Sequence, residues 1–263
     1  MSTTDFAPTA HRLGLRAWLA LVVSELKCVA RDTAGLLIPL GLPALFLTMY
    51  GLGGGAESGS GDESTGASIL DVFGIPLAVA MVLCLIGVVN MPSFLATYRR
   101  TGVLQRLSVT PVEPVHVLVA QVLVSVVQSA VGIGIAMGVA VIGFGARPQG
   151  SVLVFVGVVL LIAAAMYGIG MVVAAISPSP NSAVAIGMVG FFGMGATGGL
   201  FGPMDNLPAV MGEIGSRLPF GAGMEAVNAA WTGTGVSGGD LVALAVAAVL
   251  GLVVGVMTFR WDR

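Results

Sequence analysis

The 263-residue chain has little charge: only 9% of its residues are Asp, Glu, Lys or Arg, whereas 56% are hydrophobic. Its mean hydropathy of +1.00 excludes a soluble globular domain and indicates an integral membrane protein. Charge is also missing locally, because several long stretches contain no charged residue at all.

Motifs for catalysis and metal binding are missing as well. Lys27 is the only lysine, and no glycine-rich P-loop surrounds it, which excludes a phosphate-binding site of that kind. His11 and His116 stand apart from any cluster of Cys, His or carboxylate residues, so the sequence predicts no metal site. The two cysteines, Cys28 and Cys84, are too few for a disulfide framework. We therefore expect no enzyme and no cofactor on this chain.

Six charge-free stretches are each long enough to cross a bilayer as a helix, for which about 20 apolar residues suffice. They are Gly35–Gly55, Val72–Thr97, Val115–Ala146, Ser151–Ile176, Ser182–Met204 and Leu241–Phe259. Backbone polar groups in lipid must be paired within the segment, which makes helices the expected structure. The predicted fold class is an all-α membrane protein with six transmembrane helices.

The absence of charge inside these six stretches also limits function. Proton relays and many ion-coupled carriers depend on ionisable residues within their spans, and cation channels on rings of acidic residues. A proton-driven antiporter and an acid-lined cation channel are therefore disfavoured. If the bundle pumps, its energy must come from elsewhere.

Basic residues are distributed unequally between the two sides of the predicted bundle. Arg147 and Arg217 fall in the loops of one side; the other side holds nine of the eleven, namely Arg12, Arg16, Lys27, Arg31, Arg99, Arg100, Arg106, Arg260 and Arg263. The positive-inside rule therefore places both termini in the cytoplasm.

Residues 1–34 are predicted to form a cytoplasmic arm, and residues 35–263 the transmembrane domain. From Ala10 to Asp32, basic residues follow one helical stripe and apolar residues the other. This pattern is typical of an amphipathic helix lying in the membrane surface; a plain juxtamembrane linker helix is the alternative.

The external segment 205–240 before the last span is too apolar for a simple loop. Pro208 and Pro219 each open a stretch that favours a short helix, because proline suits the first helical turn. Both helices are expected to dip back into the outer leaflet or to cap the bundle.

Glycines at four-residue spacing predict close approach of helices, because small residues let backbones meet in lipid. The pairs are Gly134/Gly138, Gly195/Gly199, Gly198/Gly202 and Gly251/Gly255.

The longest predicted cytoplasmic connection between spans, residues 98–114, contains Gly102, Leu104, Leu107, Thr110 and Pro111. In these residues it resembles the corresponding loop of ABC-2 type permeases, which are subunits of ABC exporters. Two further stretches are similar to that family: Leu218-Pro219-Phe220 followed by Glu225-Ala226, and Phe259-Arg260-Trp261 near the C-terminus. The closest resemblance is to small antibiotic-exporter permeases of the daunorubicin-resistance type.

The resemblance implies that this loop forms a short coupling helix in a groove of a separate ATPase subunit. Val103, Leu104 and Leu107 would form an apolar ridge, and Arg99, Arg100 and Arg106 would face the partner. Gly102 would allow a bend, and Thr110-Pro111 would end the helix. Family members often carry acids at positions 98, 100 and 105; this chain has Tyr98, Arg100 and Gln105, so we expect an acidic rim on the partner. The alternative is that the arginines only set topology.

The resemblance also implies a path lined by spans two and five. Its candidate residues are Met81, Leu85, Asn90, Met188, Phe191, Phe192, Met194 and Thr197. Pro219, Phe220 and Glu225 are candidates for an external gate. An uncharged path with Met and Phe suits hydrophobic or amphipathic cargo such as a drug or antibiotic.

The implied assembly contains two ATPase subunits, which would hold ATP and Mg, and a second permease copy, with a homodimer expected. Its implied location is the bacterial cytoplasmic membrane, and no nucleic acid partner is expected. Two alternatives remain. One is an ABC-2 permease for a glycan or lipid-linked polymer, and the other is a membrane carrier or scaffold that uses no ATPase.

Overall fold

A computed structural model describes residues 15–55, 68–101 and 114–258, and in these ranges the regular structure is entirely helical. The α-helices are α1 Leu15–Arg31, α2 Thr33–Tyr50, α3 Ile75–Cys84, α4 Met91–Arg100, α6 Pro114–Gly138, α7 Val152–Ile176, α8 Pro180–Thr197, α9 Ala209–Arg217, α10 Pro219–Thr232 and α11 Gly238–Thr258. Four π-helical turns, η1 Gly51–Gly55, η2 Leu70–Gly74, η3 Leu85–Asn90 and η4 Val139–Gly143, extend or join them, and η5 Met204–Asn206 is a 3₁₀ turn.

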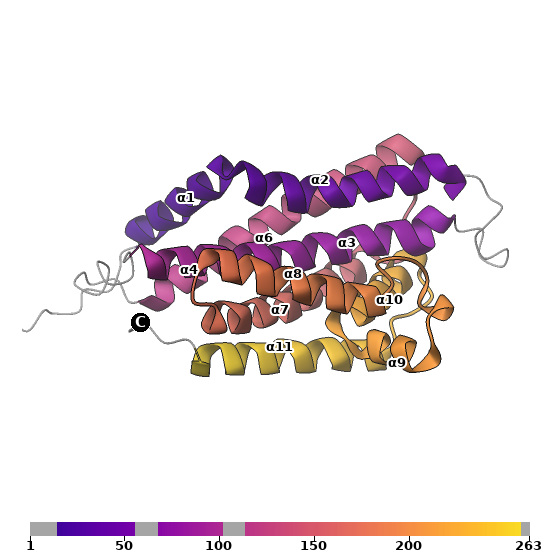
Figure 1. The fold of residues 1–263 in the computed structure, drawn as a ribbon. Helices are drawn as coiled ribbons and strands as arrows, with labels where there is room; N and C mark the ends of the chain where they lie inside the picture. The colour runs from indigo at the N-terminus through magenta and orange to yellow at the C-terminus, as the bar shows by residue number, and fades with distance from the viewer. Residues whose placement is uncertain (1–14, 56–67, 102–113, 259–263) are drawn as a thin grey trace, which may run out of the picture.

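The long helices form an elongated bundle in which α1 continues into α2 along one side, and α3 continues through η3 into α4 (Figure 1). By length and composition, five helical segments could cross a membrane: Gly35–Gly53, Leu70–Arg100, Leu118–Gly143, Val152–Ile176 and Gly238–Gly255. The prediction of an all-α membrane protein is confirmed. The start of α1 and the end of α11 lie at the same end of the bundle, together with the end of α4 (Figure 1).

The segment predicted as span five is shorter than expected. The sequence predicts Ser182–Met204, whereas α8 ends at Thr197 and the chain turns at Gly198 and Gly199. Gly199 has a φ of 96°, a left-handed conformation that favours glycine and that a continuing helix does not allow. Helix α8 is not among the five segments that meet the length and hydropathy criteria, although it also runs along the bundle (Figure 1).

The predicted second span is the central helix of the bundle. It extends from Leu70 to Arg100, and 83% of its most apolar window is buried inside the chain. Pro76 and Pro92 each follow a π-helical turn, η2 and η3. Proline lacks the N–H that would bond a carbonyl of the preceding turn, so it interrupts the helical hydrogen bonds. A π-helical turn is a common local change of a helix at such an interruption.

Helix α1 packs on its own chain. Val22 and Val29, on its predicted apolar face, are buried against Ala120 and Val124 of α6. Lys27, on the predicted basic face, is exposed. Amphipathicity thus fixes which side of α1 turns to the bundle.

The segment predicted to be external forms two helices, α9 and α10, at the end of the bundle opposite the start of α1 (Figure 1). Pro208 precedes α9 and Pro219 opens α10, as predicted. Helices α8, α9 and α10 meet closely through Gly198, Gly215 and Gly221, where an added Cβ would collide with backbone atoms of the neighbouring segment. The external helices are therefore packed onto the bundle.

Candidate functional site

The described part of the predicted coupling loop comprises its first residues, Tyr98–Thr101, at the end of α4. Arg100 is exposed there. The remaining coupling candidates, Gly102, Val103, Leu104, Arg106, Leu107, Thr110 and Pro111, lie outside the described residues.

Arg99 joins α4 to the end of α7. Its Nη2 atom donates to the carbonyl oxygen of Ala174, and to that of Ser177 at 2.6 Å. The Ala174 carbonyl has no helical donor four residues on, because that residue is Pro178, which lacks an N–H. A cation is also favourable at a helix C-terminus, where the carbonyl dipoles converge. Arg99 therefore stabilises the α7–α8 turn. This role was not predicted from the sequence, because Arg99 was assigned there to the partner surface or to membrane topology.

Tyr98 joins the same end of α4 to α1. Its hydroxyl hydrogen-bonds a carboxylate oxygen of Glu25, whose side chain is buried although it belongs to a surface helix. Burial raises the pKa of the Glu25 carboxyl above its usual value, and the hydrogen bond from Tyr98 opposes part of that rise. The loop thus begins from a turn that is bonded to both α1 and α7.

A groove of about 180 Å³ lies between α2, the η3–α4 segment and α8. We call it the inner groove; its lining residues are Asp32, Gly35, Ile38, Pro39, Leu85, Val89, Asn90, Ser93, Val184 and Met188. Three of the predicted path residues, Leu85, Asn90 and Met188, come together in it. Its surface is mostly apolar, with a carboxylate and an amide among the lining side chains.

A hydrogen-bonded polar cluster lies beside the inner groove. The carbonyl oxygen of Gly35 accepts from Asn90 Nδ2 at 3.0 Å and from Gln128 Nε2 at 2.7 Å. Asn90 Nδ2 also donates to Gln128 Oε1 at 3.1 Å. Because Pro39 cannot donate the helical N–H that Gly35 would otherwise receive, the two amides supply the missing donors. Gly35 leaves no room for a Cβ, which would lie 2.9 Å from Asn90 Oδ1.

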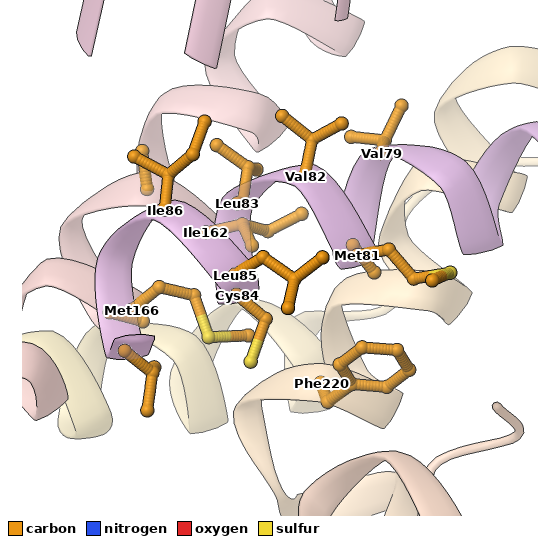
Figure 2. Close-up of a cluster of buried hydrophobic side chains, with 14 of the residues drawn as sticks. Val79, Met81, Val82, Leu83, Cys84, Leu85, Ile86, Ile162, Met166 and Phe220 are labelled. Carbon is orange, nitrogen blue, oxygen red and sulfur yellow. The ribbon is translucent and has the colours of Figure 1, made fainter. Parts of the chain in front are cut away.

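The other path candidates lie elsewhere. Met81 and Phe191 are buried in the core of the chain with Phe220, whose ring centroid is 6.2 Å from that of Phe191. Figure 2 shows Met81 and Leu85 on the side of the α3–η3 helix that faces Phe220. Phe192 is 47% exposed.

Two path candidates on the outer half of α8 are partly buried. Met194 packs against the main core, and the Thr197 hydroxyl bonds carbonyls of its own helix. The assignment of these residues to a path stays a prediction.

A second cavity, of about 290 Å³, opens at the end of the bundle that holds η2 and α10, which is the predicted external end. We call it the outer pocket; η2–α3, the turn after α8 and α10 line it with Ile69, Val72, Phe73, Pro76, Gly199, Pro203, Met204, Met224, Glu225 and Asn228. Of the predicted gate residues, Glu225 lines this pocket, whereas Pro219 and Phe220 are buried and do not line it. The Asn228 Oδ1 atom is buried and has no hydrogen-bond partner among the residues that the structure describes.

The outer ends of the central helix and α10 are also joined by a hydrogen bond. Trp231 Nε1 donates to Asp71 Oδ1 at 2.9 Å, and the other oxygen of Asp71 accepts from the Ser68 hydroxyl at 2.8 Å. Sequence reasoning missed this pair, as it missed Glu25, because the partners are far apart in the chain. The sequence does contain a signal for the Gly35 cluster. Pro39 follows Gly35 by four residues, so the Gly35 carbonyl lacks its helical N–H and needs another donor.

Comparison with known protein families gives a match to the family described as ABC-2 type transporter, over residues 16–230. The matched range runs from α1 into α10 and includes the turn at Arg99, the inner groove and the outer pocket. No curated protein matches the chain.

Proposed function

The chain belongs to the ABC-2 type transporter family, and from this premise we propose that it is the membrane subunit of an ATP-driven exporter of hydrophobic or amphipathic compounds. Family membership makes it a multi-pass membrane permease of an ABC transporter, a transport component and not the catalytic one. Its outward direction, its drug-like cargo and its partner subunits are the proposal.

The observation that carries the proposal is the bonding at the start of the cytoplasmic loop. Tyr98 is bonded to Glu25 of α1, and Arg99 to the α7–α8 turn. A displacement of the loop by an attached subunit would therefore move α1, α4 and α7 together. This is the mechanical property that a coupling element needs.

The proposed assembly has two copies of this chain and two ATPase subunits, which bind ATP and Mg. The unequal distribution of basic residues supports cytoplasmic termini. The bacterial cytoplasmic membrane is the proposed location, by the resemblance to antibiotic-exporter permeases. The inner groove, beside residues 85–93 of the central helix, and the outer pocket, beside residues 69–76 at its start, are the proposed entry and exit of the cargo path. Polar groups are few between them, which supports apolar cargo.

Charge reversal in the loop tests the coupling. In Arg100→Glu/Arg106→Glu, we expect ATP-driven efflux and ATPase co-purification to fall on the order of tenfold. The two new glutamates would be repelled by the acidic partner surface that the arginines are proposed to contact. Arg99 is left unchanged because it stabilises the fold. The measurement is ATP hydrolysis and dye efflux by the complex, purified through a tag on this chain.

Arg147→Glu is the matched control, since Arg147 is also exposed but lies in the loop between α6 and α7 at the other end of the bundle. It should leave both activities intact. Unchanged assembly and transport in the double variant would refute the coupling role. If no ATPase accompanies the chain, the ATP-independent carrier or scaffold becomes the better reading.

A further inference from the structure

We propose that the outer end of the central helix is a movable segment and that one hydrogen bond locks it against α10. The movable segment is residues 68–74, which include η2. The outer lock is the bond from Trp231 Nε1 to Asp71 Oδ1 at 2.9 Å. The outer pocket widens when this bond breaks. The inference deepens the proposed function and rests on it for the role of the outer pocket as the exit.

The helical hydrogen bonds of the central helix are interrupted at the movable segment. The Ile75 N–H bonds to the carbonyl oxygen of Leu70, five residues back, which is the π-helical pattern. Pro76 has no N–H, so the Val72 carbonyl receives no α-helical bond from it. Helices bend at prolines and π-turns because the regular series of bonds is broken there. Residues 68–74 can therefore tilt relative to α3 with little loss of helical hydrogen bonds.

Trp231 is a fixed anchor at the end of α10. Its carbonyl oxygen accepts from the N–H groups of Gln149 and Gly150, each at 2.9 Å. Gly150 fits so closely that an added Cβ would lie 2.0 Å from the Ala230 carbonyl oxygen. The indole ring packs edge-on against Phe155 of α7, with ring centroids 5.8 Å apart. Because both its backbone and its ring are held by other elements, Trp231 presents a stationary N–H donor.

The Asp71 carboxylate divides its bonds between the anchor and its own segment. Oδ1 accepts from Trp231, and Oδ2 accepts from the Ser68 hydroxyl at 2.8 Å. The bond to Ser68 lies within the movable segment and travels with it. Only the bond to Trp231 must break when the segment leaves α10.

Free volume adjoins both partners of the outer lock. Ile69 and Val72, which flank Asp71 in the sequence, line the outer pocket of about 290 Å³, and Asn228, one turn before Trp231, lines its α10 wall. The lock therefore joins two walls of the pocket. Trp231 also lines a further cavity, of about 220 Å³. A close-packed segment cannot tilt without displacing its neighbours, whereas these two spaces leave room for the movement.

The reactivity of a thiol placed in the outer pocket tests the proposal. Met224 lines the pocket from α10 and is only 6% exposed. The full-length Cys28→Ser/Met224→Cys chain in phosphatidylcholine nanodiscs is treated with N-ethylmaleimide, and mass spectrometry follows each thiol. The introduced thiol reports opening of the pocket, and the buried Cys84 reports unfolding of the core. Breaking the lock should expose the first thiol and leave Cys84 protected, because local opening costs less than global unfolding.

Variants in this background isolate the bond. Trp231→Phe removes the N–H but keeps a ring beside Phe155, so the introduced thiol should react about tenfold faster, as expected for loss of a hydrogen bond to a charged acceptor. Asp71→Leu should have the same effect, and combining the two should add nothing, because both remove one interaction. Asp71→Asn keeps an acceptor oxygen and should stay within about threefold of the parent. Ser68→Ala is the matched control: it removes the other bond of the same carboxylate and should leave the rate unchanged.

An unchanged rate in Trp231→Phe would overturn the proposal, because the bond would then not hold the segment. So would equal acceleration in Trp231→Phe and Ser68→Ala, or parallel acceleration at Cys84, since either result would show general loosening. Additive effects of Trp231→Phe and Asp71→Leu would reject the lock as well. The assay contains no ATPase, so its failure is separate from that of the exporter assignment. ATP-driven efflux by a chain whose pocket stays closed to the reagent in Trp231→Phe would retain the exporter and reject the lock.

Discussion

At the scale of single residues, the polar groups of the bundle compensate for prolines. Pro39 removes one N–H from α2, and Pro178, which follows the end of α7 at Ile176, offers none to the last turn of that helix; the carbonyls left without a donor belong to Gly35 and Ala174. Side chains from other helices donate to both carbonyls. In an apolar surrounding such an acceptor cannot rely on water, so the side-chain donor becomes a requirement of the fold.

This compensation predicts how Gln128 and Pro39 interact. Gln128→Leu should lower the free energy of unfolding by about 0.5–2 kcal/mol, because it removes the 2.7 Å bond to Gly35. In a Pro39→Ala background the loss should be smaller, since residue 39 then supplies the helical N–H. Thermal unfolding of the four proteins in detergent measures the coupling; equal losses in both backgrounds would contradict it.

At the scale of elements, glycine decides which helices meet. Gly251 of α11 faces Gly168 of α7, and a Cβ added to Gly251 would lie 2.5 Å from the Gly168 carbonyl carbon. Of the predicted glycine pairs, Gly251/Gly255 thus marks a real helix contact. Gly134 and Gly138 have the same spacing, yet an added Cβ there meets nothing within 4 Å in the described part of the chain. Spacing alone does not separate a contact face from an open one.

Substitutions in the pairs Gly251/Gly255 and Gly134/Gly138 test this difference. Gly251→Ala should destabilise the bundle by about 1–3 kcal/mol, because the new methyl group forces α11 away from the α7 backbone. Gly134→Ala should be neutral or slightly stabilising, since alanine is the better helix former at an open position. Detergent-solubilised thermal stability is the readout. Comparable losses in both variants would show that α7 and α11 are not packed this closely.

At the scale of the whole molecule, the number of membrane crossings determines where each loop lies. Helix α8 decides this number, because its 18 residues are near the lower limit for a membrane span. In the chain it lies between α7 and the helices α9 and α10. If α8 crosses, five crossings separate Cys28 from the α10–α11 connection, and the two lie on opposite sides. If it does not, they lie on the same side.

Thiol labelling distinguishes these topologies. Cys28 is exposed and Cys84 is buried, so a membrane-impermeant maleimide should label only Cys28 of the unmodified chain. We expect that label in inside-out vesicles and not in intact cells. A Cys28→Ser/Thr234→Cys variant should show the reverse, because Thr234 lies exposed after α10. Labelling of both positions from one side would exclude the predicted topology with both termini in the cytoplasm.

The sequence by itself determined the membrane class and the all-helical fold, whereas the cytoplasmic position of the loop at residues 98–114 stays a prediction. These follow from composition, charge-free length and the placement of basic residues, all of which act locally or as averages along the chain. Helices α9 and α10 were also predictable, because proline marks where each begins.

Only the tertiary structure decided which residues contact one another across the chain. Of the predicted path residues it brought Leu85, Asn90 and Met188 into one groove, while Met81 and Phe191 lie in the core. Asn90 meets Gly35 across 55 positions of sequence, and Trp231 meets Asp71 across 160. Apolar helices of uniform composition carry no local signal for which face turns inward, so the packing of backbone against glycine and the demand for hydrogen-bond donors selected these pairs.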